Sequence, residues 1–148
     1  MLLLLAPPAA LAAAKPTFET GDFVGSVAVK GKPPVEFNVT KKRIKKLDID
    51  SQRVRCSNDA VGSINLPGTV EKRSLPIHKG RFTMKVTPTG PYPAQAGTRV
   101  TGKLKNSRAS GTVRMVFRHQ TGTGEKVVCD SGTRKWSAKL DEIIVHLP

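Results

Sequence analysis

The feature that most constrains the fold is an alternation of apolar and polar residues with a period of two. It recurs in short runs along the chain, and turn residues interrupt it about every eight to twelve positions. Phe82, Met84 and Val86, for example, are separated by single polar residues. Because successive side chains of a strand point to opposite faces, this pattern predicts half-buried strands. No segment shows a convincing 3.6-residue helical period.

The runs predict an all-β domain, an antiparallel β-sandwich or partly open barrel of about eight or nine short strands. The expected strands cover residues 23–29, 35–39, 47–56, 64–66, 82–86, 100–104, 113–117, 127–129 and 136–140. The apolar positions change parity between Ile49 and Val54, which predicts a bend or bulge near Ser51–Gln52. Pro88–Gly97 contains three prolines and is expected to be a loop.

The first fourteen residues are uncharged and made of Leu, Ala and Pro after Met1. This run is too short to span a bilayer, which takes about 20 apolar residues. Its end, Ala12–Ala14, matches the cleavage region of a secretory signal peptide, although the usual basic start is missing. We expect residues 1–14 to be a signal peptide and residues 15–148 to be a single soluble domain, secreted or associated with the cell surface. A disordered tail on a cytosolic protein is the alternative.

The chain has two cysteines, Cys56 and Cys129. In an oxidising compartment an even number of cysteines predicts a disulfide, which here would close a long loop. Two buried free thiols or a metal site are the alternatives. A zinc site is disfavoured because it normally takes four ligands at short spacings, which this sequence does not supply. We expect no cofactor.

Four segments of the chain carry short motifs that follow one another in a characteristic order. These are Val100–Leu104, Arg108–Val113, Cys129-x-Ser131-Gly132 and Trp136–Ala138. Over nearly all of residues 20–140 the chain resembles a group of small exported β-rich proteins from high-GC Gram-positive bacteria. The resemblance implies the β fold, export and a Cys56–Cys129 bridge. It implies no activity.

No residue pattern names a reaction. His78, His119 and His146 are widely spaced, and surface or strand-end positions are the expected interpretation for each. Carboxylates for glycoside hydrolysis are available at Glu19, Asp22, Glu36, Asp48 and Asp50. Carboxylates at such positions are more often solvated or paired with nearby lysines than catalytic. We therefore expect a protein that is not an enzyme. A small cell-surface hydrolase is the alternative.

Charge is the most informative feature for function. The formal net charge is +14, and residues 72–124 contain eleven Lys or Arg and no Asp or Glu. A second cluster lies at Lys41–Lys46. On the expected strands, basic residues alternate with apolar ones and would form one outer face if the strands are neighbours. The predicted anion-binding residues are Arg81, Lys85, Arg99, Lys103, Lys105, Arg114 and Arg118.

Such a face would attract anionic polymers or an anionic membrane surface. The alternative is that the charges only keep the protein soluble and protect its sheet edges. Nucleic acid is an unlikely partner, because the aromatic residues are mostly expected to face inward and export removes most nucleic acid from reach. A protein-interaction or inhibitor module using the Pro88–Gly97 loop, with Tyr92 between two prolines, is a further alternative.

Overall fold

The protein is described by a computed structural model covering residues 17–64, 74–87 and 94–142. All regular secondary structure in these segments is strand, and the named strands pair antiparallel, which confirms the all-β class. The strands are β1 (Gly21–Val27), β2 (Pro34–Val39), β3 (Arg43–Ile49), β4 (Gln52–Cys56), β5 (Val61–Ile64), β6 (Leu75–Pro76), β7 (Arg81–Val86), β8 (Ala94–Lys105), β9 (Arg108–Gln120), β10 (Lys126–Asp130) and β11 (Arg134–Leu140). Within these segments there is no helix that could cross a membrane.

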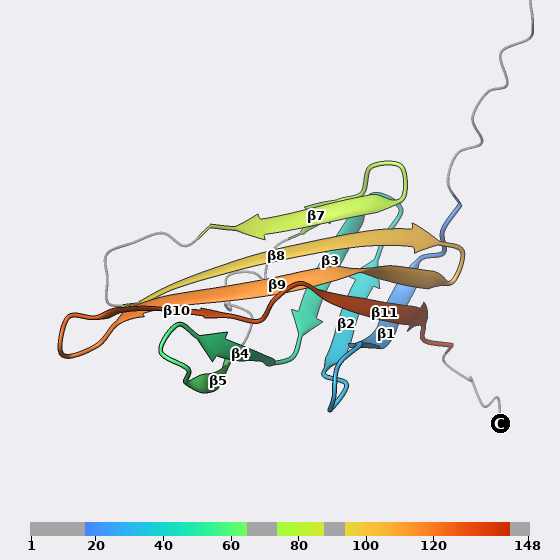
Figure 1. The fold of residues 1–148 in the computed structure, drawn as a ribbon. Coiled ribbons are helices and arrows are strands. Elements are labelled where there is room, and N and C mark those ends of the chain that lie inside the picture. The colour runs from blue at the N-terminus through green and yellow to red at the C-terminus, as the bar shows by residue number, and fades with distance from the viewer. Residues whose placement is uncertain (1–16, 65–73, 88–93, 143–148) are drawn as a thin grey trace, which may run out of the picture.

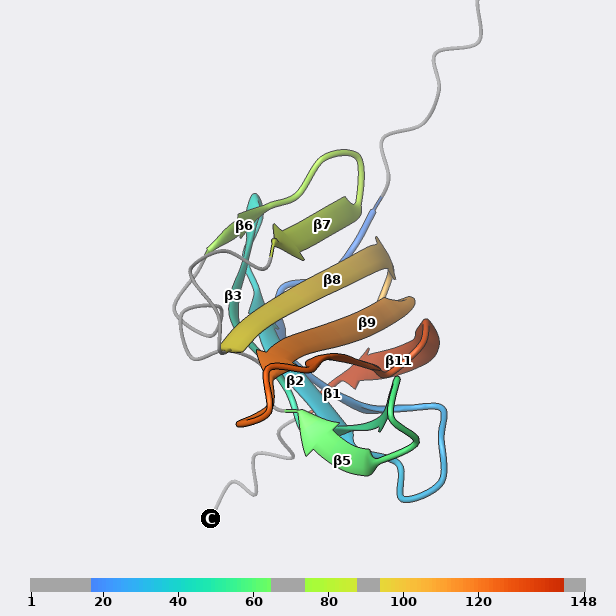
Figure 2. The same cartoon turned by 60° about the vertical axis from the view of Figure 1, so that its left-hand side comes forward.

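The long strand β9 organises the sheet. Along one edge it pairs with β8 over nearly its whole length, and along the other it pairs first with β11 and then with β10. From β11 the sheet continues through β1, β2 and β3 to β6, and from β10 it continues through β4 to β5. Strand β7 adds to the free edge of β8. Figure 1 and Figure 2 show β7, β8 and β9 as neighbours, with β1, β2 and β3 crossing behind them.

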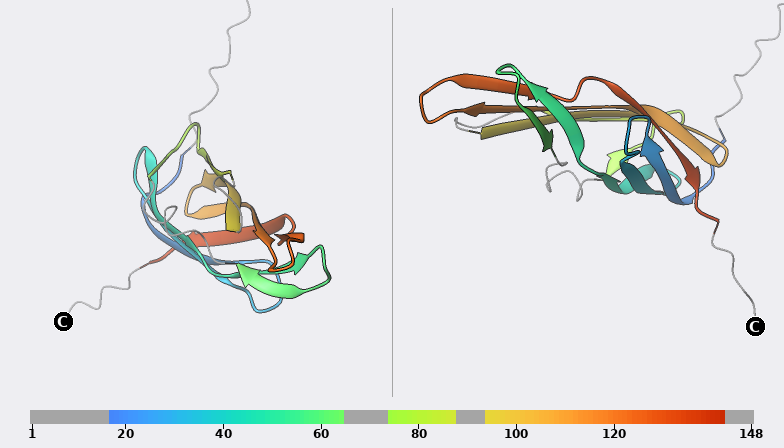
Figure 3. Two further views of the ribbon diagram at one scale, coloured as in Figure 1. Left: turned by 90° about the vertical axis from the view of Figure 1, so that its left-hand side faces the viewer. Right: turned by 60° about the horizontal axis from the view of Figure 1, so that its bottom comes forward.

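The sheet curls on itself into a half-barrel, which can be followed end-on in Figure 3. Of the two expected architectures, the structure therefore matches the partly open barrel. The inner face of the curl holds the main hydrophobic core, to which β1, β2, β3, β6, β7, β8, β9 and β11 contribute buried residues. The outer face carries the intervening polar and charged residues, as the period of two requires.

Four aromatic side chains fill the centre of the core. Phe23 on β1 and Phe37 on β2 are register partners whose rings stack with centroids 5.4 Å apart. Trp136 on β11 meets Phe37 edge to face at 5.7 Å, and the ring of Phe82 on β7 lies 6.1 Å from Trp136. Aromatic pairs of this kind contribute about 0.5–1.5 kcal/mol each beyond their burial. They connect β7 to β1 and β2 across the inside of the curl.

Two glycines make room for these rings. Phe82, Gly102, Gly111 and Trp136 are successive register partners on β7, β8, β9 and β11. A Cβ atom at Gly102 would lie 2.2 Å from the ring of Phe82. At Gly111 it would lie 1.8 Å from the carbonyl oxygen of Thr101 and 2.8 Å from the indole of Trp136. The backbone and the rings therefore pack closely because these positions have no side chain.

The disulfide between Cys56 and Cys129 is present, as predicted. The two cysteines are register partners on β4 and β10, and these strands share only one further register pair, Arg55–Asp130. A small second core containing Val54 and Val127 packs around Cys129. The bridge therefore holds the β4–β5 hairpin against β10. Disulfides are typical of oxidising compartments such as the extracellular space.

The predicted bend at Ser51–Gln52 is confirmed. Strand β3 ends at Ile49 and β4 begins at Gln52, and the buried positions change from odd to even numbers across this break. The expected strand near residues 64–66 is observed as β5, which begins and ends earlier along the chain. Leu66 lies outside the described residues.

The structure corrects the expected loop at Pro88–Gly97. Ala94–Gly97 pair with Val116–His119 and form the beginning of β8. All three prolines of the segment precede Ala94, so none of them interferes with this ladder. Strands β8 and β9, with 12 and 13 residues, are consequently much longer than the strands expected at 100–104 and 113–117. The small and polar residues at 94–97 are weak strand formers, which hid the extension.

Candidate anion-binding face

The seven basic residues predicted to bind anions lie on three adjacent strands, and all seven are exposed. They are Arg81 and Lys85 on β7, Arg99, Lys103 and Lys105 on β8, and Arg114 and Arg118 on β9. Neighbours in the chain, such as Phe82, Val100 and Met115, are buried in the core. Since alternate residues point to opposite faces, the charged side chains lie together on the outer side of the sheet.

Cations lie directly opposite one another on these strands. Arg81 on β7 is the register partner of Lys103 on β8. Lys85 on β7 pairs with Arg99 on β8, and Arg99 pairs in turn with Arg114 on β9. Cβ atoms of directly paired residues lie about 4.5–5.5 Å apart, and like charges at that separation destabilise a sheet. An anion bound over these rows would relieve the repulsion.

Three further cations extend the surface toward β11. Arg108 on β9 and Lys135 and Lys139 on β11 are exposed, and they share the outer side with the seven predicted residues. We call these ten residues the basic face. Arg108 could have been recognised from its even-numbered position, which it shares with Arg114 and Arg118. Lys135 and Lys139 could not, because the pairing of β11 with β9 joins distant parts of the chain.

Only one cation of the basic face is in an ion pair within the described residues. The guanidinium of Arg114 donates hydrogen bonds to both carboxylate oxygens of Asp130 on β10, with the Nε atom 3.1 Å from each. This hydrogen bonding holds the pKa of Asp130 below its usual value, and it raises the pKa of Arg114. The backbone N–H of Gly132 also donates to Asp130, at 2.8 Å, and lowers that pKa further. Among the residues that the structure describes, the other nine cations have no acidic partner.

The carboxylates that the sequence offered as catalytic candidates lie away from the basic face. The candidate carboxylates Glu19, Asp22, Glu36, Asp48 and Asp50 are all exposed, and none of them lines a groove of the basic face. Two of them, Glu36 on β2 and Asp48 on β3, are direct register partners on the outer side. The outer surface is therefore divided between basic strands, β7, β8, β9 and β11, and a part that also contains carboxylates, β2 and β3.

The histidines are not brought together. His78 is exposed in the turn before β7. His119 is in β9, where its ring stacks on Phe117 at 5.4 Å and its Nδ1 atom is buried with no hydrogen-bond partner among the described residues. His146 and Tyr92 lie outside the described residues. Over residues 17–64, 74–87 and 94–142, no group of three His, Cys, Asp or Glu side chains is placed to hold a metal ion.

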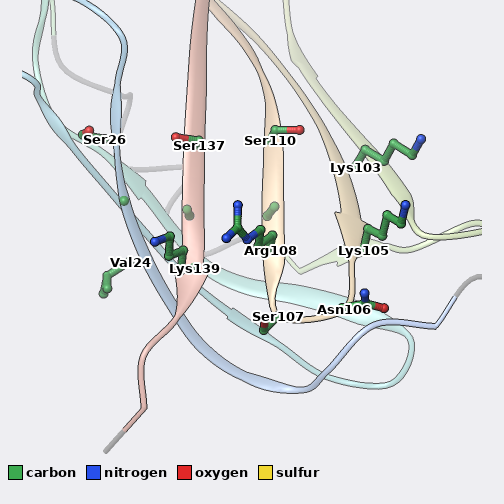
Figure 4. Close-up of a pocket in the computed structure, with 13 residues that line it drawn as sticks. Val24, Ser26, Lys103, Lys105, Asn106, Ser107, Arg108, Ser110, Ser137 and Lys139 are labelled. Carbon is green, nitrogen blue, oxygen red and sulfur yellow. The ribbon is translucent and has the colours of Figure 1, made fainter.

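An open groove of about 760 Å³ crosses β1, β11, β9 and β8 on the outer side (Figure 4). Three serines, Ser26, Ser137 and Ser110, form one row across it as successive register partners. Lys103 on β8 continues this row. The adjacent row consists of Val24, Lys139, Arg108 and Lys105. The groove thus combines small hydroxyl side chains with long cationic ones, and no acidic residue lines it.

A smaller groove of about 310 Å³ lies toward the other end of the basic face. Its lining includes Lys85, Arg99, Arg114 and Arg118, together with Asp130. Cations therefore line both grooves. Between the two grooves, along β8 and β9, lies the register pair Thr101–Thr112, whose hydroxyls hydrogen-bond to each other at 2.8 Å.

Comparison of the chain with protein-family models, with curated proteins and with solved structures finds no match. The resemblance to exported β-rich bacterial proteins therefore stays a prediction.

Proposed function

We propose that this chain is an exported, non-enzymatic protein that binds an anionic polymer of the cell envelope through its basic face. The observation that carries the proposal is the direct pairing of Lys85, Arg99 and Arg114 on three neighbouring strands. Solubility alone is served as well by interspersed charges of both signs. A row of like charges lowers the stability of the sheet, and a bound polyanion would offset the repulsion between the cations.

A polymer fits this surface better than a membrane does. Proteins that lie on membranes insert Trp, Phe or Leu between the lipids in addition to their basic residues. The large exposed apolar side chains within the described residues are Val24, Val61 and Val128. None of them is aromatic, and they lie on three different strands, β1, β5 and β10. The face therefore offers electrostatic attraction without apolar anchors.

The disulfide supports the exported location. Cys56 and Cys129 are joined in the structure, and such bridges persist in oxidising compartments outside the cytosol. Anionic polymers of the cell envelope would be within reach of an exported protein. The exported location is therefore consistent with the proposed envelope polymer as the ligand.

The proposal is tested by retention of the purified protein on isolated cell envelopes and on a sulfonated resin at increasing salt. We expect retention at low salt that falls steeply as salt rises, because exposed charges are screened over about 10 Å at 0.1 M salt. The triple variant Lys85→Glu/Arg99→Glu/Arg118→Glu should lose most of the retention. Retention that is independent of salt, or unchanged in the triple variant, would contradict the proposal.

A further inference from the structure

We infer that the polymer bound by the basic face consists of hydroxylated repeats, sugars or polyols, that carry anionic groups, and that part of it lies in the groove across β1, β11, β9 and β8. The inference rests on the proposed polyanion binding and adds the chemistry of the repeat. The serine row of the groove suggests this chemistry, because hydroxyl side chains add nothing to charge attraction.

The three serines of the groove have unused hydrogen-bonding capacity. Ser110 and Ser137 are exposed and Ser26 is half-buried. Within the described part of the chain none of the three hydroxyls has a hydrogen-bond partner, unlike the hydroxyls of the next row, Thr101 and Thr112. Each serine hydroxyl provides one donor and two acceptor sites. Three neighbouring strands, whose backbones are about 4.8 Å apart, thus each offer a free hydroxyl.

The cationic row runs parallel to the serine row. On β11, Lys139 lies two residues beyond Ser137, and on β9, Arg108 lies two residues before Ser110. Two residues along a strand span about 7 Å, which is within the length of a lysine or arginine side chain. Each of these strands therefore presents a hydroxyl and a cation side by side, as Figure 4 shows. A linear polymer crossing the strands would meet this combination repeatedly.

The pairing of hydroxyl and cation selects the chemistry of the ligand. The cations attract any anion and the serine hydroxyls can donate to its oxygens, but the acceptor sites of the serines are used only by a ligand that has donors of its own beside the charge. A lipid surface would leave the serines to water and has no apolar anchor here except Val24. A nucleic-acid strand would need aromatic stacking partners, and none of the residues lining the groove is aromatic. A hydroxylated polyanion uses both rows.

The experiment compares two soluble polymers and two double variants. Polygalacturonate carries a carboxylate and hydroxyls on each repeat, and inorganic polyphosphate carries charge without hydroxyls. The variants are Ser110→Thr/Ser137→Thr and Ser110→Val/Ser137→Val, which have nearly the same shape and differ in the hydroxyls. Both introduce β-branched residues that favour strands, and thermal unfolding of each variant verifies the fold.

We expect the valine variant to bind polygalacturonate about tenfold more weakly than the threonine variant, as the loss of two hydrogen bonds implies. Polyphosphate, which can only accept hydrogen bonds from the hydroxyls, should show a smaller difference between the two variants. If the two variants bind polygalacturonate equally while the wild-type protein binds both polymers, the inference is wrong and the proposed function stands. If the wild-type protein binds neither polymer, the proposed function itself is wrong. Tighter binding to vesicles of anionic phospholipid than to either polymer would overturn the choice of ligand.

Discussion

Lys85 on β7 and Arg99 on β8 face each other directly across the sheet, and neither has an acidic partner among the described residues. Arg114 continues the row on β9. Most exposed positions of a sheet tolerate many residue types, so like charges at paired positions indicate a requirement other than folding. The paired cations lower the stability of this part of the sheet, a loss that the proposed binding of a polyanion would offset.

Replacement of Arg99 by glutamate should separate stability from binding. The Arg99→Glu variant places a carboxylate opposite Lys85 and beside Arg114, which turns repulsion into attraction. Cross-strand pairs of this kind are worth about 0.2–1 kcal/mol each. We expect the free energy of unfolding at low salt, measured by denaturant titration, to rise by an amount in this range while retention on anionic resin falls.

Arg118→Glu is the matched control for this change. Arg118 lies on the same face, but its register partners are Gln95 and Val128 rather than cations. The control should weaken retention without the gain in stability. A loss of stability in Arg99→Glu, or equal effects of the two variants on stability, would show that the paired cations do not repel one another.

The ion pair of Arg114 with Asp130 should make part of the stability depend on pH. Because hydrogen bonding to Arg114 lowers the pKa of Asp130 in the folded protein, the stabilisation is present above the usual aspartate pKa. It is lost as the pH falls through the lowered value. We expect Asp130→Asn to be less stable than wild type at neutral pH and the difference to shrink in strong acid. A difference that stays constant down to that pH would contradict this assignment.

The same substitution should strengthen binding. In Asp130→Asn the guanidinium of Arg114 is released and the basic face gains one net positive charge. Retention on a sulfonated resin, which remains ionised in acid, should therefore increase at neutral pH. In acid the wild-type protein should approach the retention of the variant, because protonated Asp130 no longer competes for Arg114. Unchanged retention at neutral pH would show that Arg114 does not contribute to the face.

The glycine beneath Trp136 should tolerate no side chain. In Gly111→Ala the new methyl group would lie 1.8 Å from the carbonyl oxygen of Thr101, so the backbone has to move. Overpacking of this kind costs about 1–3 kcal/mol. Gly122→Ala is the control, because no atom lies within 4 Å of the Cβ position there. Equal melting temperatures for the two variants would contradict the close packing between β8, β9 and the indole.

Removal of the disulfide should affect the β4–β5 hairpin first. Cys56 and Cys129 are 73 residues apart, and in the chain-entropy model closing such a loop stabilises the fold by about 4 kcal/mol at most. In Cys56→Ser/Cys129→Ser we expect amides of β4 and β5 to lose protection from hydrogen exchange before those of β1 and β2. Uniform loss of protection throughout the sheet would show that the bridge supports the main core as well.

Local patterns were sufficient to predict the fold class and the disulfide. The period of two placed Phe82, Met84 and Val100 in the core, and the parity change after Ile49 placed the bend. The extension of β8 to Ala94 was not predictable, because its first residues are weak strand formers that are held in place by β9. The curl into a half-barrel likewise depends on pairings between segments far apart in the chain, such as β1 with β11.

The site could be predicted only in part for the same reason. Alternation with core residues identified the outward direction of Arg81, Lys103 and the other predicted cations. The groove depends on the registers that align Ser26, Ser137 and Ser110 across three strands. A shift of one residue in either register would turn a serine inward. Local patterns along the chain do not reveal how these registers align distant strands.

The central claim is that the placement of the cations, rather than the net charge, binds the polymer. It is tested by the affinity for polyphosphate as a function of salt in two variants of equal net charge. One is Lys85→Glu/Arg99→Glu/Arg118→Glu, and the other is Lys30→Glu/Lys41→Glu/Lys45→Glu, whose exposed positions lie in or next to β1, β2 and β3. We expect the first to lose most of the affinity and of the salt dependence, and the second to retain both. Equal losses in the two variants would contradict the claim.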